Sequence, residues 1–121
     1  MLSDLADHPR VSAARVWLEE RFSAAFHPGT FELAREADRD ATFFYYAWSV
    51  AHAFRALGIK EIHSQGQRVA WADALSRELI RRQREDGTWI NRFTASKEDD
   101  PLVATSFAAG ALGICRTFLT R

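Results

Sequence analysis

Apolar residues recur at three- and four-residue spacing in four segments of the chain, which predicts four helices. Two segments, about 10–26 and 68–84, carry an apolar stripe with charged residues elsewhere, as expected of one-sided surface helices. The other two, about 41–57 and 101–118, are apolar nearly all round, so we expect them to be buried on most sides. Few stretches alternate with period two, so the sequence predicts an all-α fold without strands.

Residues with capping preferences flank the two apolar segments. Asp40 is a natural N-cap for the first of them, and Gly58 is a natural stop after it. Asp100 is the corresponding N-cap before the second, with Pro101 as the first helical residue. We therefore expect both apolar helices to begin directly after an aspartate.

The four segments alternate between amphipathic and apolar, which indicates an internal repeat. Gly29 and Gly87 are almost as far apart in the chain as Asp40 and Asp100. Each unit would be an amphipathic outer helix, a turn containing glycine and an aromatic residue, and an apolar inner helix. The prediction is a single domain over 1–121, with one helical hairpin at about 9–58 and a second at about 68–119.

The turn of the second unit carries a recognisable motif, Leu79-x3-Gln83-x3-Gly87-x-Trp89. It resembles the latter half of the QW motif of squalene–hopene cyclases and other class II terpenoid cyclases. Residues 40–115 are similar to the C-terminal part of squalene-cyclase-like proteins with prenyltransferase and squalene oxidase repeats. In the first unit, Phe22 stands where the motif has Gln. The resemblance implies an α/α toroid in which the motif joins an outer helix to an inner one, with chemistry in the central cavity.

The same resemblance implies a candidate catalytic acid at the head of an inner helix. Class II cyclases protonate their substrate with an aspartate of a DxDD motif, and Asp38 and Asp40 occupy the analogous place here. Asp40 falls on the acid position, but Ala41 replaces the aspartate that should follow. The other interpretation of Asp40 is structural, as the helix cap already described.

Aromatic residues supply the candidate ligand-binding positions. Tyr45, Trp48 and His52 share one side of the first apolar helix by spacing. Their ring faces could line a cavity and stabilise a carbocation. Rings at this spacing also fill the core between two layers of helices, and both interpretations stay open.

Composition excludes several classes of partner and cofactor. Sixteen basic residues balance sixteen acidic ones, so no global field attracts nucleic acid. The single cysteine, Cys115, excludes an internal disulfide and a zinc site built from cysteines, and the four histidines lack ligand spacing, so we expect no metal and no cofactor. The longest uncharged run, 101–115, is shorter than the ~20 residues of a transmembrane helix. Because the first residues lack the pattern of a signal peptide, we expect a cytoplasmic protein.

Two hairpins leave the inner helices open on one side, since repeat units bury their faces only against neighbours. The toroids of the similar family use about six hairpins. The chain is then a fragment of a longer protein, a homo-oligomer such as a trimer that restores six hairpins, or a compact four-helix bundle. Of these we expect self-association.

Three functions remain open on the sequence. The first is a terpenoid-cyclase-like repeat domain that binds an isoprenoid or another apolar small molecule in an aromatic cavity formed on self-association. Any catalysis there would be of the isomerase or lyase type, with Asp40 as the acid. The second is a non-catalytic helical-repeat module for assembly or partner binding. The third is a fragment of a larger α/α-toroid enzyme, such as a carbohydrate-active hydrolase or lyase.

Overall fold

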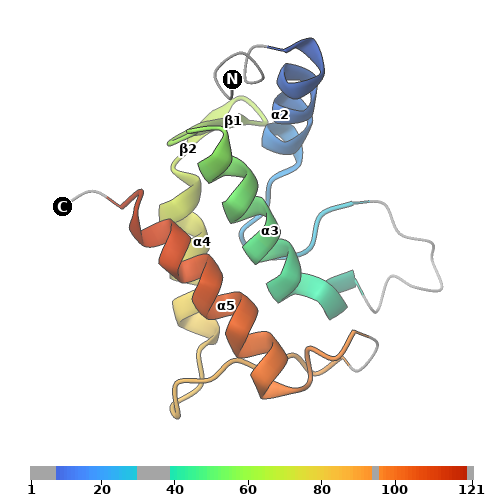
Figure 1. Ribbon diagram of the computed structural model, residues 1–121, viewed down its shortest axis with the longest axis vertical. Coiled ribbons are helices and arrows are strands. Elements are labelled where there is room, and N and C mark those ends of the chain that lie inside the picture. Colours follow the sequence, from blue (N-terminus) through green and yellow to red (C-terminus); the bar gives the residue numbers. More distant parts are fainter. Residues whose placement is uncertain (1–7, 30–38, 94–95, 120–121) are drawn as a thin grey trace.

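The computed structural model describes residues 8–29, 39–93 and 96–119. Within these ranges the chain forms mainly helices, as the sequence predicts, and a short β-hairpin precedes the third of them (Figure 1). The elements in chain order are α2 (Pro9–Arg21), α3 (Phe43–Ala56), β1 (Ile62–Ser64), β2 (Gln67–Val69), α4 (Trp71–Arg82) and α5 (Pro101–Arg116). None of the described helices is both long enough and apolar enough to cross a membrane.

The β-hairpin corrects the expectation of a fold without strands. Strand β1 pairs antiparallel with β2, with His63 opposite Arg68. The turn residues Gln65 and Gly66 have φ angles of 51° and 78°, and positive φ at both central residues is the backbone of tight hairpin turns. Each strand has only three residues, so alternation along the sequence is too short to detect.

The two amphipathic helices are shorter than their apolar stripes indicate. Helix α2 ends at Arg21, and Phe22 already has an extended backbone with ψ of 136°. The Ser23 hydroxyl then accepts hydrogen bonds from the backbone N–H groups of Ala25 and Phe26, which fixes a turn in place of a further helical turn. Helix α4 begins at Trp71 because the residues before it belong to β2.

The helix caps agree with the sequence at α5 and differ at α3. Asp100 is the N-cap of α5, as predicted, and its Oδ1 accepts from the N–H of Leu102 at 2.9 Å. The N-cap of α3 is Thr42, and a 3₁₀ turn over 39–42 precedes it. The expectation that Asp40 caps α3 is therefore wrong, because its Oδ1 accepts instead from the backbone N–H of His27 at 2.8 Å.

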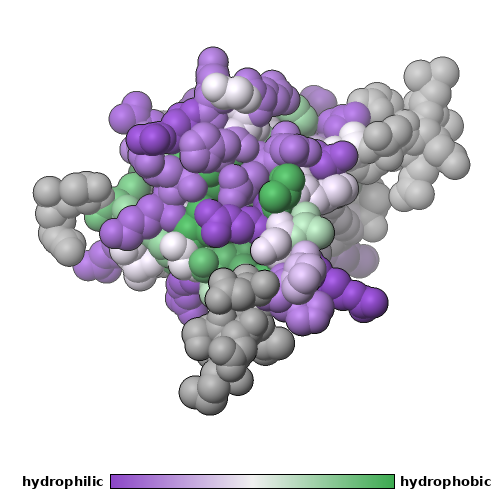
Figure 2. Space-filling view, turned by 90° about the horizontal axis from the view of Figure 1, so that it is seen from above, coloured by the Kyte–Doolittle hydropathy of each residue, from purple (hydrophilic) through white to green (hydrophobic). Residues whose placement is uncertain are grey.

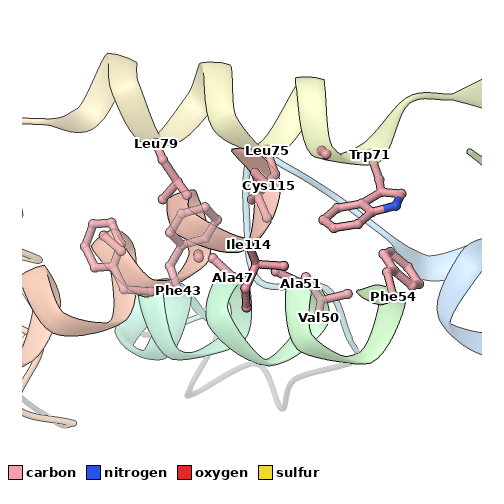
Figure 3. Packing of buried hydrophobic residues seen from close by; sticks show 14 of the residues in the cluster. Phe43, Ala47, Val50, Ala51, Phe54, Trp71, Leu75, Leu79, Ile114 and Cys115 are labelled. Carbon is pink, nitrogen blue, oxygen red and sulfur yellow. The ribbon is translucent and has the colours of Figure 1, made fainter. Parts of the chain in front are cut away.

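The core lies where α3, α4 and α5 meet. Helices α3 and α5 lie side by side and run in the same direction, and α4 runs in the opposite direction against α5 (Figure 1). Figure 3 shows Trp71, Leu75 and Leu79 pointing from α4 towards the buried side of α3, which contributes Phe43 and Phe54. The Trp71 indole donates a hydrogen bond to the Ile59 carbonyl at 2.7 Å, so its polar atom is satisfied inside the core.

Helix α2 lies beside β1 at one end of the molecule (Figure 1). The Glu19 Oε2 atom accepts from the backbone N–H of His63 at 3.1 Å, and Leu18 packs against the edge of the core. Val16 and Trp17 remain more than half exposed. Seen from above this end, the described surface is mostly hydrophilic, and hydrophobic side chains show through only in patches (Figure 2).

Candidate functional site

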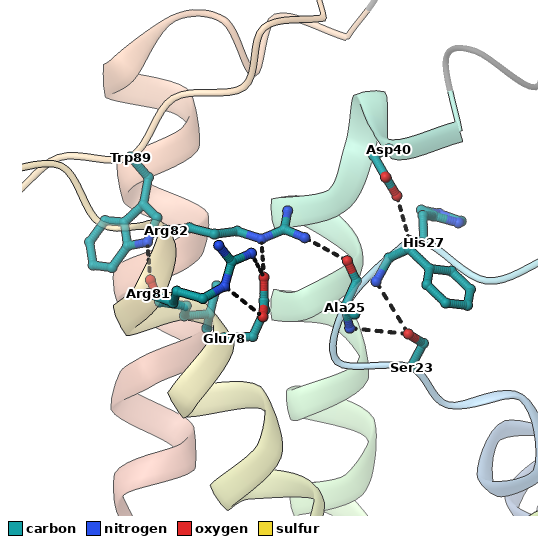
Figure 4. Close-up of polar contacts among 10 residues, drawn as sticks. Ser23, Ala25, His27, Asp40, Glu78, Arg81, Arg82 and Trp89 are labelled. Carbon is teal, nitrogen blue, oxygen red and sulfur yellow. Dashed lines mark hydrogen bonds and ion pairs between the residues drawn. The ribbon is translucent and has the colours of Figure 1, made fainter.

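The structure brings the four motif residues of the second unit together. The Trp89 indole Nε1 donates to the Leu79 carbonyl at 2.7 Å, and the Gln83 amide donates to the Gly87 carbonyl at 2.8 Å (Figure 4 draws the Trp89 bond). Gly87 has φ of 89°, a conformation that favours glycine. The backbone N–H of Trp89 donates to Thr105 Oγ1 on α5 at 3.0 Å. The turn therefore joins the end of α4 to α5 through a buried tryptophan.

Arg82, next to this turn, connects α4 to the segment that follows α2. Its Nε donates to Glu78 at 2.6 Å and its Nη2 donates to the Ala25 carbonyl at 2.5 Å (Figure 4). Its guanidinium carbon lies 3.8 Å from the centre of the Phe43 ring. Hydrogen bonds from Arg81 and Arg82 hold the pKa of Glu78 below its ordinary value. Arg82 is thus a half-buried structural residue that joins α4 to the segment after α2.

Asp40, the predicted catalytic acid, lies in a cleft with a volume of about 410 Å³. The cleft is lined by Asp40, Phe44, Arg82, Ile90, Asn91, Arg92 and Phe93. The Oδ1 atom of Asp40 is already occupied by the His27 N–H, as Figure 4 shows. Asp38, the second predicted acid, lies outside the described residues. In this cleft the Asp40 carboxylate holds the segment around His27 in place through this hydrogen bond.

Glu98 is a buried carboxylate in the acidic run that precedes α5, and its contacts with α3 are not evident from the sequence. It is only 1% exposed, and its two oxygens accept from the backbone N–H groups of Phe44 at 3.0 Å and Tyr45 at 2.8 Å. The Asn91 amide donates to the same carboxylate at 3.3 Å. Burial raises the pKa of Glu98 above its ordinary value, against the opposing effect of these hydrogen bonds. Glu98 therefore supplies the cap of α3 from a loop 54 residues away in sequence.

The three predicted ligand-binding residues come together with Phe107 of α5 in what we call the aromatic cluster: Tyr45, Trp48, His52 and Phe107. Ring centres are 4.5 Å apart for Trp48 and His52, 5.4 Å for Tyr45 and Phe107, and 5.8 Å for Trp48 and Phe107. Tyr45 is 49% exposed and His52 is exposed. The cluster thus forms part of the surface between α3 and α5, and it shares no residue with the lining of the Asp40 cleft.

A glycine allows this surface to form. A Cβ atom on Gly110 of α5 would lie 2.9 Å from Trp48 Cδ1, closer than side chains tolerate. The absence of a side chain at Gly110 therefore lets the Trp48 ring lie against α5. In this way α5 determines where the ring of Trp48 rests.

The described part of the chain contains neither a cluster of metal ligands nor a reactive cysteine. No group of three or more His, Cys, Asp or Glu side chains among the described residues is placed to hold a metal ion. Cys115 is fully buried, and burial raises the pKa of its thiol to about 12. A thiol with such a pKa stays protonated and unreactive near neutral pH.

Comparison with known proteins does not assign the chain to a family. No protein-family model matches it, and searches of curated proteins and of solved structures found no match either.

Proposed function

We propose that this chain is a non-catalytic helical assembly module that associates with further copies of itself through the face formed by α3 and α5. The observation that carries this proposal is the outward side of α5. The exposed residues of α5 are Pro101, Leu102, Ser106, Ala109, Gly113 and Arg116, so the only charge among them is at the C-terminal end of the helix. Leu102 is 76% exposed, and the aromatic cluster extends the same apolar surface onto α3.

The outward side of α4 has a different character. Arg77 and Arg81 are exposed there and pair with Asp73 and Glu78. Helices that face water normally carry such charges on the wet side, whereas extended apolar patches mark interaction surfaces. The α3–α5 face therefore has the composition of a covered surface, and the net charge of zero leaves no overall repulsion between copies.

A cyclic trimer is the form of assembly that we propose. The parallel α3 and α5, with α4 packed antiparallel against α5, support a pairing of inner and outer helix in the second unit, as expected of an α/α toroid (Figure 1). The hydrogen-bonded turn of Leu79, Gln83, Gly87 and Trp89, which we call the clamp, supports the resemblance to class II terpenoid cyclases. That resemblance is part of the proposal. Three copies would supply about six hairpins around one axis and would enclose the aromatic cluster. An isoprenoid or another apolar small molecule would then bind between the copies.

The geometry favours assembly over the two enzymatic alternatives. Cation chemistry requires an acid that faces the aromatic cavity, but Asp40 lies in a separate cleft with one oxygen engaged by His27. A carbohydrate-active hydrolase or lyase requires a polar groove, whereas most of the side chains on the α3–α5 face are apolar.

The test is the molar mass in solution of three proteins, measured by sedimentation equilibrium. We expect the wild type to have the mass of a trimer and Leu102→Glu to have that of a monomer. Glutamate is favourable in the first turn of a helix, so Leu102→Glu should remain folded. Ile80→Glu is the matched control, because Ile80 is 60% exposed on α4, and it should keep the wild-type mass. A monomeric wild type, or a Leu102→Glu variant that assembles like wild type, would refute the proposal.

A further inference from the structure

We propose a binding site for a small uncharged ring compound in the pocket between α2 and α3, which we call the α2–α3 pocket. Its walls include Trp17, Leu18 and Phe22 from the α2 side, Pro28 from the following segment, and Tyr46 and Val50 from α3. Val50 is buried and forms the floor, whereas Trp17 is exposed at the rim. The pocket is thus open to solvent at one end and apolar at the other.

The size and lining of the pocket decide the class of ligand. Its volume is about 150 Å³. A closed apolar cavity of about this volume, ~150 Å³, holds benzene-sized molecules, which sets the scale for a ligand of this pocket. A longer hydrocarbon such as an isoprenoid chain would exceed the space. The volume therefore points to a compound with one or two fused rings, such as indole.

Hydrogen bonds fix the segment after α2, which forms one wall of the pocket. The Tyr46 hydroxyl donates to the Ser23 carbonyl at 2.7 Å and accepts from the Ser23 N–H at 3.1 Å. Arg39 Nη1 donates to the His27 and Gly29 carbonyls at 3.1 and 3.0 Å, and Asp40 accepts from the His27 N–H. Because the segment after α2 is fixed at several points, it does not collapse into the pocket. A preformed pocket binds its ligand without the cost of ordering its walls.

The polar groups around the pocket already have partners, which favours an uncharged ligand. The Arg21 guanidinium lies 4.3 Å from the centre of the Trp17 ring and donates to the Trp17 carbonyl. The His27 Nδ1 lies 2.8 Å from the Pro28 carbonyl oxygen, and the His27 ring packs against Tyr46 at 5.2 Å. Burial raises the pKa of Tyr46 to about 12, so its hydroxyl stays neutral. The rings and aliphatic groups are left as the ligand-facing surface.

This site is independent of the proposed assembly. Tyr46 and Val50 line the α2–α3 pocket, whereas Tyr45, Trp48 and His52 belong to the aromatic cluster on the α3–α5 face. None of the pocket residues belongs to the surface that we assign to self-association. A monomeric chain would therefore retain the pocket.

The experiment is an NMR titration of the full chain with indole. We expect saturable chemical-shift changes at Leu18, Tyr46 and Val50, and none with myo-inositol, a polar ring of similar size. Val50→Phe fills the floor of the pocket and should weaken indole binding at least tenfold. Val16→Phe is the matched control, since Val16 is 53% exposed on α2 outside the pocket, and its affinity should equal that of wild type.

A second variant keeps the test decisive if Val50→Phe does not fold. Leu18→Phe narrows the pocket from the α2 side at a half-buried position and should also weaken binding. The proposal is overturned if folded wild type shows no saturable shifts at the pocket, or if the shifts occur at Tyr45 and Trp48 instead. It is equally overturned if a folded Val50→Phe variant binds indole as wild type does.

Discussion

The unit formed by α4 and α5 is closed by a buried tryptophan, whereas the unit formed by α2 and α3 is joined by scattered polar contacts. In the second unit the Trp89 indole, 3% exposed, bonds to Leu79 while its backbone bonds to Thr105. A single residue thus fixes the end of one helix against the next, through its side chain on α4 and its backbone on α5. Helix α4 consequently packs against α5.

The first unit lacks an equivalent clamp among its described residues. Phe22 occupies the place of the glutamine, and α2 has already ended at Arg21. The following segment is held by the Tyr46 hydroxyl and by Asp40, and α2 itself is held to β1 by Glu19. The comparison teaches that an amphipathic stripe alone does not decide where an outer helix lies. The turn that follows it has to supply a buried anchor, and where it does not, a pocket remains.

The largest difference between the units, in the free energy of unfolding lost on mutation, should appear when Trp89 is replaced. Trp89→Ala leaves a cavity between α4 and α5 and an unpaired Leu79 carbonyl, so we expect a loss of about 3–5 kcal/mol in the free energy of unfolding. Trp89→Phe keeps most of the packing and loses the indole hydrogen bond, for about 1–2 kcal/mol. Phe22→Ala, at a half-buried position, should cost less than half as much as Trp89→Ala. Urea denaturation followed by circular dichroism measures all three, and equal costs for Trp89→Ala and Phe22→Ala would contradict the comparison.

The next largest effect should come from Glu98, which carries the connection between the units. Glu98→Ala leaves the N–H groups of Phe44 and Tyr45 without their acceptor, and we expect a loss of about 2–3 kcal/mol. The control is Asp99→Ala, which removes a neighbouring carboxylate and should change stability by less than about 0.5 kcal/mol. Amide hydrogen exchange at Phe44 and Tyr45 should accelerate only in the Glu98 variant. Unchanged exchange there would show that Glu98 does not cap α3.

A smaller effect is expected where the two units meet, at Gly110. Gly110→Ala places a Cβ against Trp48 and should lower stability by about 1–2 kcal/mol. Gly113→Ala, on the same helix, adds a Cβ that would have no atom within 4 Å, and it should raise stability by about 0.5–1 kcal/mol. Thermal unfolding in the Leu102→Glu background separates these effects from association. If both variants shift the melting temperature equally, the close approach of Trp48 to α5 is refuted.

The smallest effect, below about 1 kcal/mol, should be a difference between the units in how carboxylates make the stability depend on pH. Burial raises the pKa of Glu19, but hydrogen bonds from Arg15 and from the His63 N–H outweigh it and hold the pKa below the ordinary 4.5. Its stabilising contribution is therefore present above pH 4.5 and is lost as the pH falls through the folded-state pKa. For Glu98 the pKa is raised, so its contribution is present below pH 4.5 and is lost as the pH rises through the folded-state pKa.

Urea midpoints measured on both sides of pH 4.5 test these opposite signs. Glu19→Gln should reduce the loss of stability on acidification, whereas Glu98→Gln should increase it. If the dependence of the urea midpoint on pH changes in the same direction in both variants, the pKa values of Glu19 and Glu98 are not shifted in opposite directions.

Several features of the fold could be predicted because they depend on neighbours in sequence. The centres of the four helices follow from periodicity, and the Asp100 cap with Pro101 follows from local backbone chemistry. The proximity of Tyr45, Trp48 and His52 and the hydrogen bond from Gln83 to Gly87 also follow, since the residues concerned lie within a few positions of one another. Short-range geometry was sufficient in each case.

Other features could not be predicted because their partners are distant in sequence. Asp40 has the local features of a cap, yet its carboxylate bonds to His27, and Glu98 caps α3 in its place. The short strands and the position of α2 beside β1 depend on which surfaces meet after folding. No local pattern distinguishes these arrangements from the predicted ones.

By itself the sequence determined the helical character, the alternation of amphipathic and apolar segments, and the chemistry of the turn at Trp89, because these depend on periodicity and on backbone conformations a few residues long. The tertiary structure decided which carboxylate caps α3, where α2 lies, and which apolar surfaces remain open on α5 and beside Val50. Those outcomes depend on competition between surfaces far apart in the chain, and burial resolves that competition only when all the elements are packed together.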